Sequence, residues 1–422
     1  MAIKFHEKAV AIFGTQQLAE GISAINDAPT GTISTTVASA TVTGVSTLFT
    51  TQIQVGTYLY TTTGAIIGRV LTIASATSLT LEDNVPASPT AQSEGVQAVA
   101  TAVTGVAFKT GLGPKNALAV LNLNYSTELT TEAFQYTGNE LDRDEDTVVT
   151  DKYAKFDCEV FVPSLGTIAG TDPVLSEVPM VDWFTSSGMA VLLSSGSLGK
   201  ATITNSVASN TFLTIEVRRS SPDLTLQQKV FVMTDARGVI DLDAKVGTRG
   251  KLKLNYQGNL STVVDKFSLV PNFADQKTEH AGSLKSTTIT TAQLDLYSGS
   301  TEPTYVPTTK SVCFDKVDAP NLPGFEYTRY LTGCIDGWSK GASPSDVTLT
   351  ILEDKAAATY NPDNHIEELH ALFVAYGSVT GKKVEFLFHK LQLAKVTNSK
   401  VANYAGQDLG FRNVGTTDIV LS

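Results

Sequence analysis

The chain has 422 residues, of which 17% are charged, and its formal net charge at pH 7 is −11. This length predicts two or three domains, and the abundance of Thr, Ser, Ala, Val and Gly favours β-structure. The acidic balance argues against a protein that holds nucleic acid through phosphate contacts, because such binding needs a basic stripe.

The first ninety residues are predicted to contain an N-terminal arm, residues 1–30, and a small β module. A helix is expected within the arm, over residues 15–25. From residue 31 to 89 charged residues nearly vanish, and short strands with frequent turns are expected at 58–60, 66–73 and 78–82. We interpret residues 31–89 as a compact β domain of roughly 55–60 residues that is inserted into a larger one.

The pattern is strongest from Leu118 to Gly188, and the rest of the chain is interpreted around this unit. Apolar residues alternate with polar ones over residues 119–125 and again over 155–162, which is typical of half-buried strands. A short aromatic helix is expected at residues 179–184. The unit is therefore predicted as a strand, an acidic loop, a second strand and a helix.

A carboxylate-rich segment separates these two strands. Its aspartates are spaced as at the start of an EF-hand, but Thr147 stands where that loop needs glycine, and Tyr153 stands where it needs a bidentate Glu. No nucleophile or positioned partner accompanies the carboxylates, so a general acid–base pair is not predicted either. We interpret the segment as a solvated acidic loop, with the candidate residues Glu140, Asp142, Asp144, Glu145 and Asp146.

After the central unit, successive antiparallel hairpins are predicted, and the pattern restarts from about residue 288. Turn signals occur at residues 235–238 and 246–250. Alternating or apolar runs predict strands at 211–217, 229–233, 239–242, 251–256, 294–297, 311–317, 346–352 and 383–393.

A helix is expected from about Asp363 to Gly377, because its apolar residues follow a helical spacing: Ile366, Leu369, Phe373 and Tyr376. Each half of the chain then runs strand, loop, aromatic helix, glycine, and a basic turn into a strand. This order suggests a structural duplication, and the alternative of an unduplicated chain stays open.

Motifs that would carry chemistry lack their essential parts. Cys158, Cys313 and Cys334 form no C-x-x-C pair, so buried or half-buried thiols in a reducing compartment are expected. His365 and His370 stand five residues apart and would not share a helix face as a metal pair does. No catalytic, cofactor-binding or metal site is predicted. The chain also lacks a signal-peptide pattern and an 18-residue apolar span, so synthesis in the cytoplasm without a membrane partner is expected.

Several short motifs follow one another in a consistent order. In the central unit they are Glu128, Tyr136-Thr137-Gly138, Arg143-Asp144, the strand 155–160, Pro179, Trp183-Phe184 and Ser187-Gly188. Later ones are Asp235-Ala236-Arg237-Gly238, the stretch 247–258, and Gln392-Leu393 after a glycine-basic turn. In this order they resemble the major tail tube proteins of long-tailed bacteriophages, over about residues 1–30 and 95–422. Residues 31–89 resemble the small Thr/Val/Gly-rich β modules of phage structural proteins.

The resemblance implies an all-β fold with a few short helices. Antiparallel β-sandwich or barrel tube lobes are expected at residues 95–275 and 276–422, with 1–30 as an arm of the tube domain and 31–89 as an outward decoration. Such protomers form rings that stack into the tail tube of the virion, through which genomic DNA passes without specific binding. Rings usually have six lobes, so the chain would form a homotrimer if it is duplicated and a homohexamer if it is not. The other implied partners are the tape measure and tail terminator proteins.

The physics of the sequence is compatible with a tube wall. Ring closure removes the open edges of antiparallel sheets, and excess carboxylates keep a DNA conduit from binding phosphate. We therefore expect a lumen of net negative potential, with the acidic loop at the lumen or at a ring interface.

Two other classes of protein stay open. A carbohydrate- or cell-surface-binding β-sandwich module would also have Thr-rich strands and scattered aromatic residues. A β-rich hydrolase is the second alternative, and no recognisable site supports it.

Overall fold

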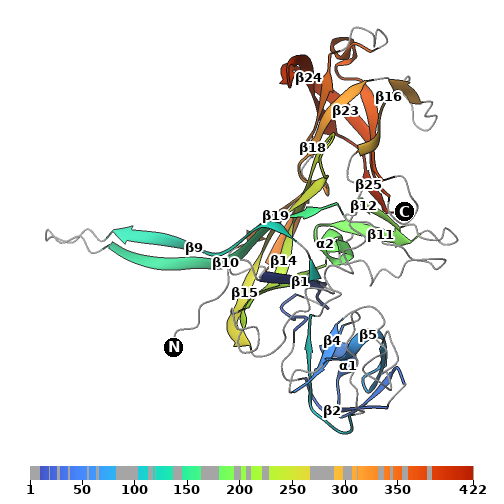
Figure 1. The fold of residues 1–422 in the computed structure, drawn as a ribbon. Coiled ribbons are helices and arrows are strands. Elements are labelled where there is room, and N and C mark those ends of the chain that lie inside the picture. The colour runs from blue at the N-terminus through green and yellow to red at the C-terminus, as the bar shows by residue number, and fades with distance from the viewer. Residues whose placement is uncertain are drawn as a thin grey trace.

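The protein, described by a computed structural model, consists mainly of antiparallel β-strands (Figure 1). The strands form a 17-stranded sheet, a six-stranded sheet and a two-stranded sheet. This confirms the predicted all-β fold with a few short helices. The structure describes residues 10–18, 20–25, 29–36, 39–54, 57–62, 66–81, 103–112, 117–118, 120–135, 145–162, 180–193, 201–205, 211–220, 228–266, 289–297, 307–310, 312–330, 337–342, 346–353, 360–377 and 383–421.

The six-stranded sheet forms a β module with its own hydrophobic core (blue strands in Figure 1). Backbone hydrogen bonds join Ile33 to Val106, and β7 pairs with β4, so the module includes residues 103–112, which the sequence assigned to the first tube lobe. The predicted strands at 58–60, 66–73 and 78–82 are confirmed as three of its strands. The elements are β2 (Thr32–Thr35), β3 (Thr41–Val45), α1 (Phe49–Gln52), β4 (Tyr58–Thr61), β5 (Ile66–Ser75), β6 (Ser78–Leu81) and β7 (Phe108–Gly111).

The 17-stranded sheet contains strands from both halves of the chain. Those of the first half are β1 (Val10–Gln16), β8 (Ala117–Leu118), β9 (Leu121–Gln135), β10 (Glu145–Phe161), β11 (Met189–Leu193), β12 (Ala201–Asn205), β13 (Leu213–Ser220), β14 (Gln228–Lys245) and β15 (Lys251–Lys266). Those of the second half are β16 (Ile289–Tyr297), β17 (Pro307–Lys310), β18 (Cys313–Ala319), β21 (Asp346–Leu352), β22 (Leu369–Tyr376), β23 (Val384–Val401), β24 (Tyr404–Asn413) and β25 (Thr417–Leu421). The pairs β14–β18 and β12–β25 join the two sets. The remaining strands, β19 (Phe325–Tyr330) and β20 (Gly337–Ala342), form the two-stranded sheet.

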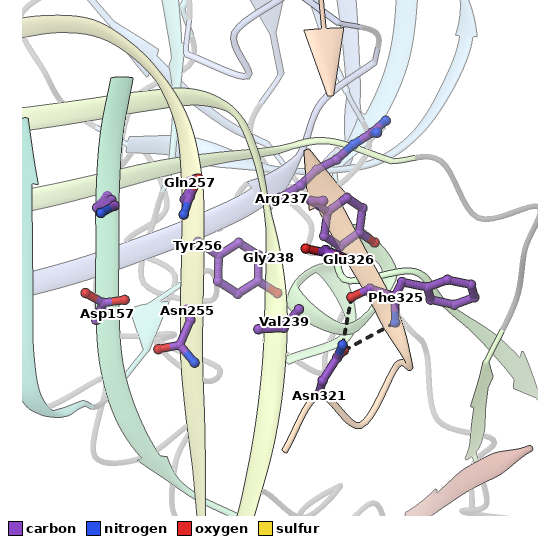
Figure 2. A pocket seen from close by; sticks show the side chains of 12 residues that line it. Asp157, Arg237, Gly238, Val239, Asn255, Tyr256, Gln257, Asn321, Phe325 and Glu326 are labelled. Atoms are coloured by element: carbon purple, nitrogen blue, oxygen red, sulfur yellow. Dashed lines mark hydrogen bonds between the residues drawn. The ribbon is translucent and has the colours of Figure 1, made fainter. Parts of the chain in front are cut away.

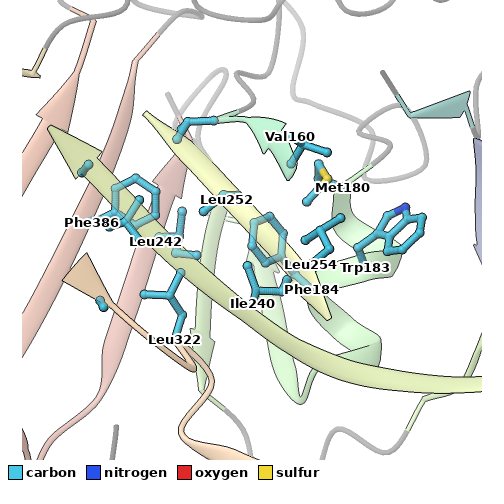
Figure 3. Packing of buried hydrophobic residues seen from close by; sticks show 14 of the residues in the cluster. Val160, Met180, Trp183, Phe184, Ile240, Leu242, Leu252, Leu254, Leu322 and Phe386 are labelled. Carbon is cyan, nitrogen blue, oxygen red and sulfur yellow. The ribbon is translucent and has the colours of Figure 1, made fainter. Parts of the chain in front are cut away.

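Helix α2 (Met180–Ser186) packs against the main core, which confirms the predicted aromatic helix. Trp183 is fully buried and meets the Tyr256 ring edge-on, with the ring centroids 5.1 Å apart. Gly14 of β1 makes room for it, since a Cβ atom there would lie 2.6 Å from the Trp183 ring. Figure 3 shows that the same cluster extends from α2 to Leu242 and Phe386, so both halves of the chain share one core.

The helix expected over residues 15–25 is wrong. Residues Val10–Gln16 form β1, which pairs with β13 and with β8. Leu18 and Ile22, two of the apolar residues of the expected helix, are 46% and 44% exposed, and Gly21 has a φ of +76°. A short helix with its apolar residues in water gains no packing, and without packing it is not stable.

The turn expected at residues 235–238 is a β-bulge within one long strand, β14. The register to β15 shifts between Thr234 and Arg237, and Asp235 has a φ of +52°. The strand continues at Gly238, where a Cβ atom would lie 2.1 Å from the carbonyl oxygen of Asn255. In the Asp-Ala-Arg-Gly sequence, Asp235 adopts the positive φ of the bulge and Gly238 permits the close contact between strands. Asp and Gly are also common in turns, which explains the turn prediction.

The helix expected from Asp363 to Gly377 is also wrong. Only a 3-10 helix is present at Pro362–His365; Glu367 then has a φ of +69°, and residues Leu369–Tyr376 form β22. His370, Leu372 and Val374 are buried with the period of two that defines a strand. The suggested duplication relied on an aromatic helix in each half, so the second half lacks this element of the correspondence.

Among the described residues, no helix has the length and apolar character needed to cross a membrane.

Candidate functional site

One face of the central sheet is charged, and the opposite face packs into the main core. Phe156 of β10, Leu254 of β15 and Ile240 of β14 are buried, while the residues between them point to the other side. We call this second side the polar face. It carries charges of both signs, with the carboxylates Asp157, Glu159, Asp241, Asp243 and Asp318 among the ammonium groups of Lys155, Lys245, Lys251, Lys253 and Lys316.

Ion pairs link neighbouring strands along much of the polar face. The Nζ atom of Lys251 lies 2.9 Å from a carboxylate oxygen of Glu159, and this hydrogen bond lowers the pKa of Glu159 from its ordinary value. Asp243 lies opposite Asp318 across β14 and β18, and the Nζ atom of Lys316 contacts both, at 3.7 and 3.0 Å. The lysine thus offsets the repulsion that two facing carboxylates would cause.

A cavity of about 620 Å³ lies at one end of the polar face (Figure 2). Asp157, Asn255 and Val239 lie side by side on three adjacent strands along its floor. Asn321 and Phe325 line the side formed by the segment between β18 and β19. The Asn321 amide donates to the Phe325 carbonyl at 2.9 Å and accepts from the Phe325 N–H at 3.3 Å. The Asn321 N–H donates to the Asp241 carboxylate of β14 at 2.7 Å, which holds this segment over the sheet.

Two cations and two carboxylates line the cavity. The cations are Lys155 and Arg237, and the carboxylates are Asp157 and Glu326. The guanidinium of Arg237 packs over the Phe212 ring, 3.8 Å from its centroid, and burial lowers the pKa of Arg237 from its ordinary value. Burial raises the pKa of Asp157, the nearby carboxylate of Glu128 adds to this effect, and Lys155 opposes it. The cavity is therefore polar and has no net charge.

The strands β9 and β10 form a two-stranded arm that projects away from the body (Figure 1). The pairing of β10 with β15 begins at Ala154, so residues 145–153 of β10 pair with β9 alone. Along residues 127–135, β9 pairs with β10 on one side, and no described strand pairs with its other side. Leu129 of this strand is 55% exposed. The arm therefore has an open edge and an apolar side chain in water.

The structure contradicts the predicted loop conformation for two of the five acidic candidates. Glu145 and Asp146 belong to β10, opposite Gln135 and Phe134 of β9, because the strand is longer than its apolar alternation indicates. The other three candidates, Glu140, Asp142 and Asp144, lie outside the described residues.

The two histidines that were considered as a metal pair make other contacts. His370 is buried and its Nε2 lies 2.9 Å from the Tyr360 hydroxyl, whereas His365 contacts the Glu368 carboxylate. No group of three or more His, Cys, Asp or Glu is arranged for a metal ion in the part of the chain that the structure describes.

The cysteine prediction holds for one residue and fails for another. Cys158 is buried in the core, and burial raises the pKa of its thiol. Cys313 is exposed, because it starts β18 ahead of the first buried position of that strand, Val317. Cys334 lies outside the described residues.

The polar face itself was not predicted. Its signal is present in two strands, where Lys alternates with Leu over residues 251–254 and acids flank Cys158. The sequence does not show that these strands are neighbours or that β18 joins them. The ion pairs depend on that non-local pairing.

No protein-family model and no curated protein sequence matches this chain.

Proposed function

We propose that the protein is a structural subunit that assembles with copies of itself into stacked rings, as the tail tube of a phage through which genomic DNA is delivered. The observation that carries the proposal is the open edge of the arm. The resemblance described for the sequence motifs supports the same class of protein.

The arm needs a neighbour. A two-stranded ribbon is marginally stable in water, and an unpaired edge strand is a template for pairing with another chain. The edge strand β17 is short and begins with Pro307, which cannot donate a ladder hydrogen bond, whereas β9 has fifteen residues and no proline. The partner that satisfies this edge is a second copy of the chain, and in a closed ring the β9 edge of every subunit would be covered.

The distribution of charge suits a conduit. The polar face carries charges of both signs, and the described part of the arm contains one lysine, Lys152, and five acidic residues: Glu128, Glu132, Glu145, Asp146 and Asp151. A surface without excess positive charge does not hold phosphate. We propose that the lumen has net negative potential and that residues of the arm contribute to it.

Negative-stain electron microscopy of the purified chain tests the proposal. Rings or tubes at micromolar concentration are the expected result. Particles that stay monomeric at every concentration and salt condition would contradict it.

A further inference from the structure

The cavity on the polar face has hydrogen-bonding groups that the protein itself does not use. Asp157, Gln257 and Glu326 line it, and their side chains make no hydrogen bond to any described residue. The Nζ atom of Lys155 lies 5.5 Å from the centroid of the Tyr153 ring, and its charge acts on the Asp157 carboxylate without a hydrogen bond between them. Elsewhere on the same face the lysines and carboxylates pair with one another. The pairing therefore stops where the cavity begins.

These groups define the chemistry of a ligand. Two carboxylates and an amide next to an ammonium group accept and donate hydrogen bonds over a short distance, which matches the hydroxyl groups of a polyol. Tyr327 adds an aromatic ring to the lining, and such a ring packs against the C–H face of a sugar. The volume of about 620 Å³ lies within the roughly 300–1,000 Å³ that is usual for small-molecule sites.

Other ligand classes fit less well. An anion such as a nucleotide needs a net positive site, and here Lys155 and Arg237 are balanced by Asp157 and Glu326. A β-strand peptide binds to an open sheet edge, whereas the floor of this cavity is the face of paired strands. Burial has also raised the pKa of Asp157, which indicates a carboxylate that has lost water without gaining a donor.

We propose that this cavity is a binding site for a neutral saccharide, with Asp157, Gln257 and Glu326 as hydrogen-bonding residues and Tyr327 as the aromatic contact. The site lies within one chain, so the proposal does not depend on assembly into rings.

Saturation-transfer difference NMR of the full-length protein tests this site with a panel of neutral disaccharides: maltose, cellobiose, lactose and N,N′-diacetylchitobiose. At least one is expected to bind with a Kd of about 1 mM or tighter. Asp157→Ala and Gln257→Ala are each expected to weaken binding about tenfold. Because neither side chain has a hydrogen bond to lose, the urea midpoint of both variants is expected to stay near that of the wild type.

Lys253→Ala is the matched control, since Lys253 lies on the same face, outside the lining of the cavity, and contacts Asp243. This variant is expected to bind the sugar as the wild type does. The proposal is overturned if no disaccharide binds, if the two cavity variants bind normally, or if Lys253→Ala weakens binding equally. Displacement of the sugar by equimolar inorganic phosphate would overturn the claim of a neutral ligand.

Discussion

Arg218 of β13 is the side chain that ties the β module to the body. Its Nε atom lies 2.6 Å from a Glu216 oxygen, its Nη2 donates to the Leu112 carbonyl at 3.0 Å, and the Tyr60 hydroxyl donates to the same carbonyl at 2.9 Å. All four residues are buried. The second Glu216 oxygen has no hydrogen-bond partner among the described residues, so the Arg218 guanidinium neutralises this buried carboxylate.

Arg218→Met is expected to lower the free energy of unfolding by about 3–5 kcal/mol, because it leaves the Glu216 carboxylate buried and unpaired. Urea unfolding followed by circular dichroism measures the change. The double variant with Glu216→Leu is expected to recover much of the loss. Lys251→Met, which breaks an ion pair near the surface, is the control and should cost about 1 kcal/mol or less. Equal losses in the two single variants would contradict this account.

His389 predicts a specific pH dependence. Its Nε2 lies 2.7 Å from Asp418, and this hydrogen bond raises the pKa of His389 above its ordinary value. Burial opposes the shift of Asp418, but its bonds to His389 and Thr204 lower its pKa. The folded state therefore binds the histidine proton more tightly than the unfolded state does. The stabilisation is complete below the ordinary histidine pKa of about 6.5 and is lost as pH rises through the higher folded value.

The urea midpoint of the wild type is accordingly expected to fall as pH rises above about 6.5, by an amount that His389→Gln and Asp418→Asn both remove. Profiles of the two variants as steep as that of the wild type would show that this pair does not titrate with folding.

In the proposed assembly, the two-stranded arm is the element that pairs with a neighbouring subunit. Leu129→Glu places a charge at an exposed apolar position of β9. Because the side chain is exposed, the unfolding free energy is expected to change by about 0.5 kcal/mol or less. The protein concentration needed for assembly is expected to rise at least about tenfold. Sedimentation velocity measures the second effect. Val246→Glu, at another exposed apolar position in the turn after β14, is the control and should assemble normally. If both variants assemble equally well, the arm is not part of the interface between subunits.

The elements also show what sequence patterns can predict. The alternation over residues 155–162 and 346–352 predicted β10 and β21, because one face of each strand packs into the core. The pattern failed at β22, where the run of apolar residues around Phe373 matches a helix and a strand equally well, and only the pairing with β16 and β23 decides. The open edge of the arm, the ion pairs of the polar face and the cavity rest on pairings between distant segments, which no local pattern encodes.

The β module includes strand β7, so a deletion that removes the module cleanly must extend beyond residue 89. Deleting residues 31–89 would take away β4, the partner of β7, and leave Phe108 without its core. We expect that deletion to yield aggregated protein. Replacing residues 26–116 by a Gly-Ser linker removes the module with all its strands, and rings are expected to form as in the wild type if the module is an outward decoration. Electron microscopy of both deletions, after size-exclusion chromatography, distinguishes these outcomes. Loss of rings in the complete deletion would make the module part of the wall.

We propose that the open edge of the arm pairs with a second copy of the chain in a closed ring. A cryo-electron microscopy map averaged along the axis of the assembled particle tests it most directly. We expect a hollow ring of six lobes, built from three or six chains, with residues 127–135 of β9 paired to a neighbouring subunit around a lumen of negative potential. A ring whose arms point freely into solvent, or a basic lumen, would contradict it.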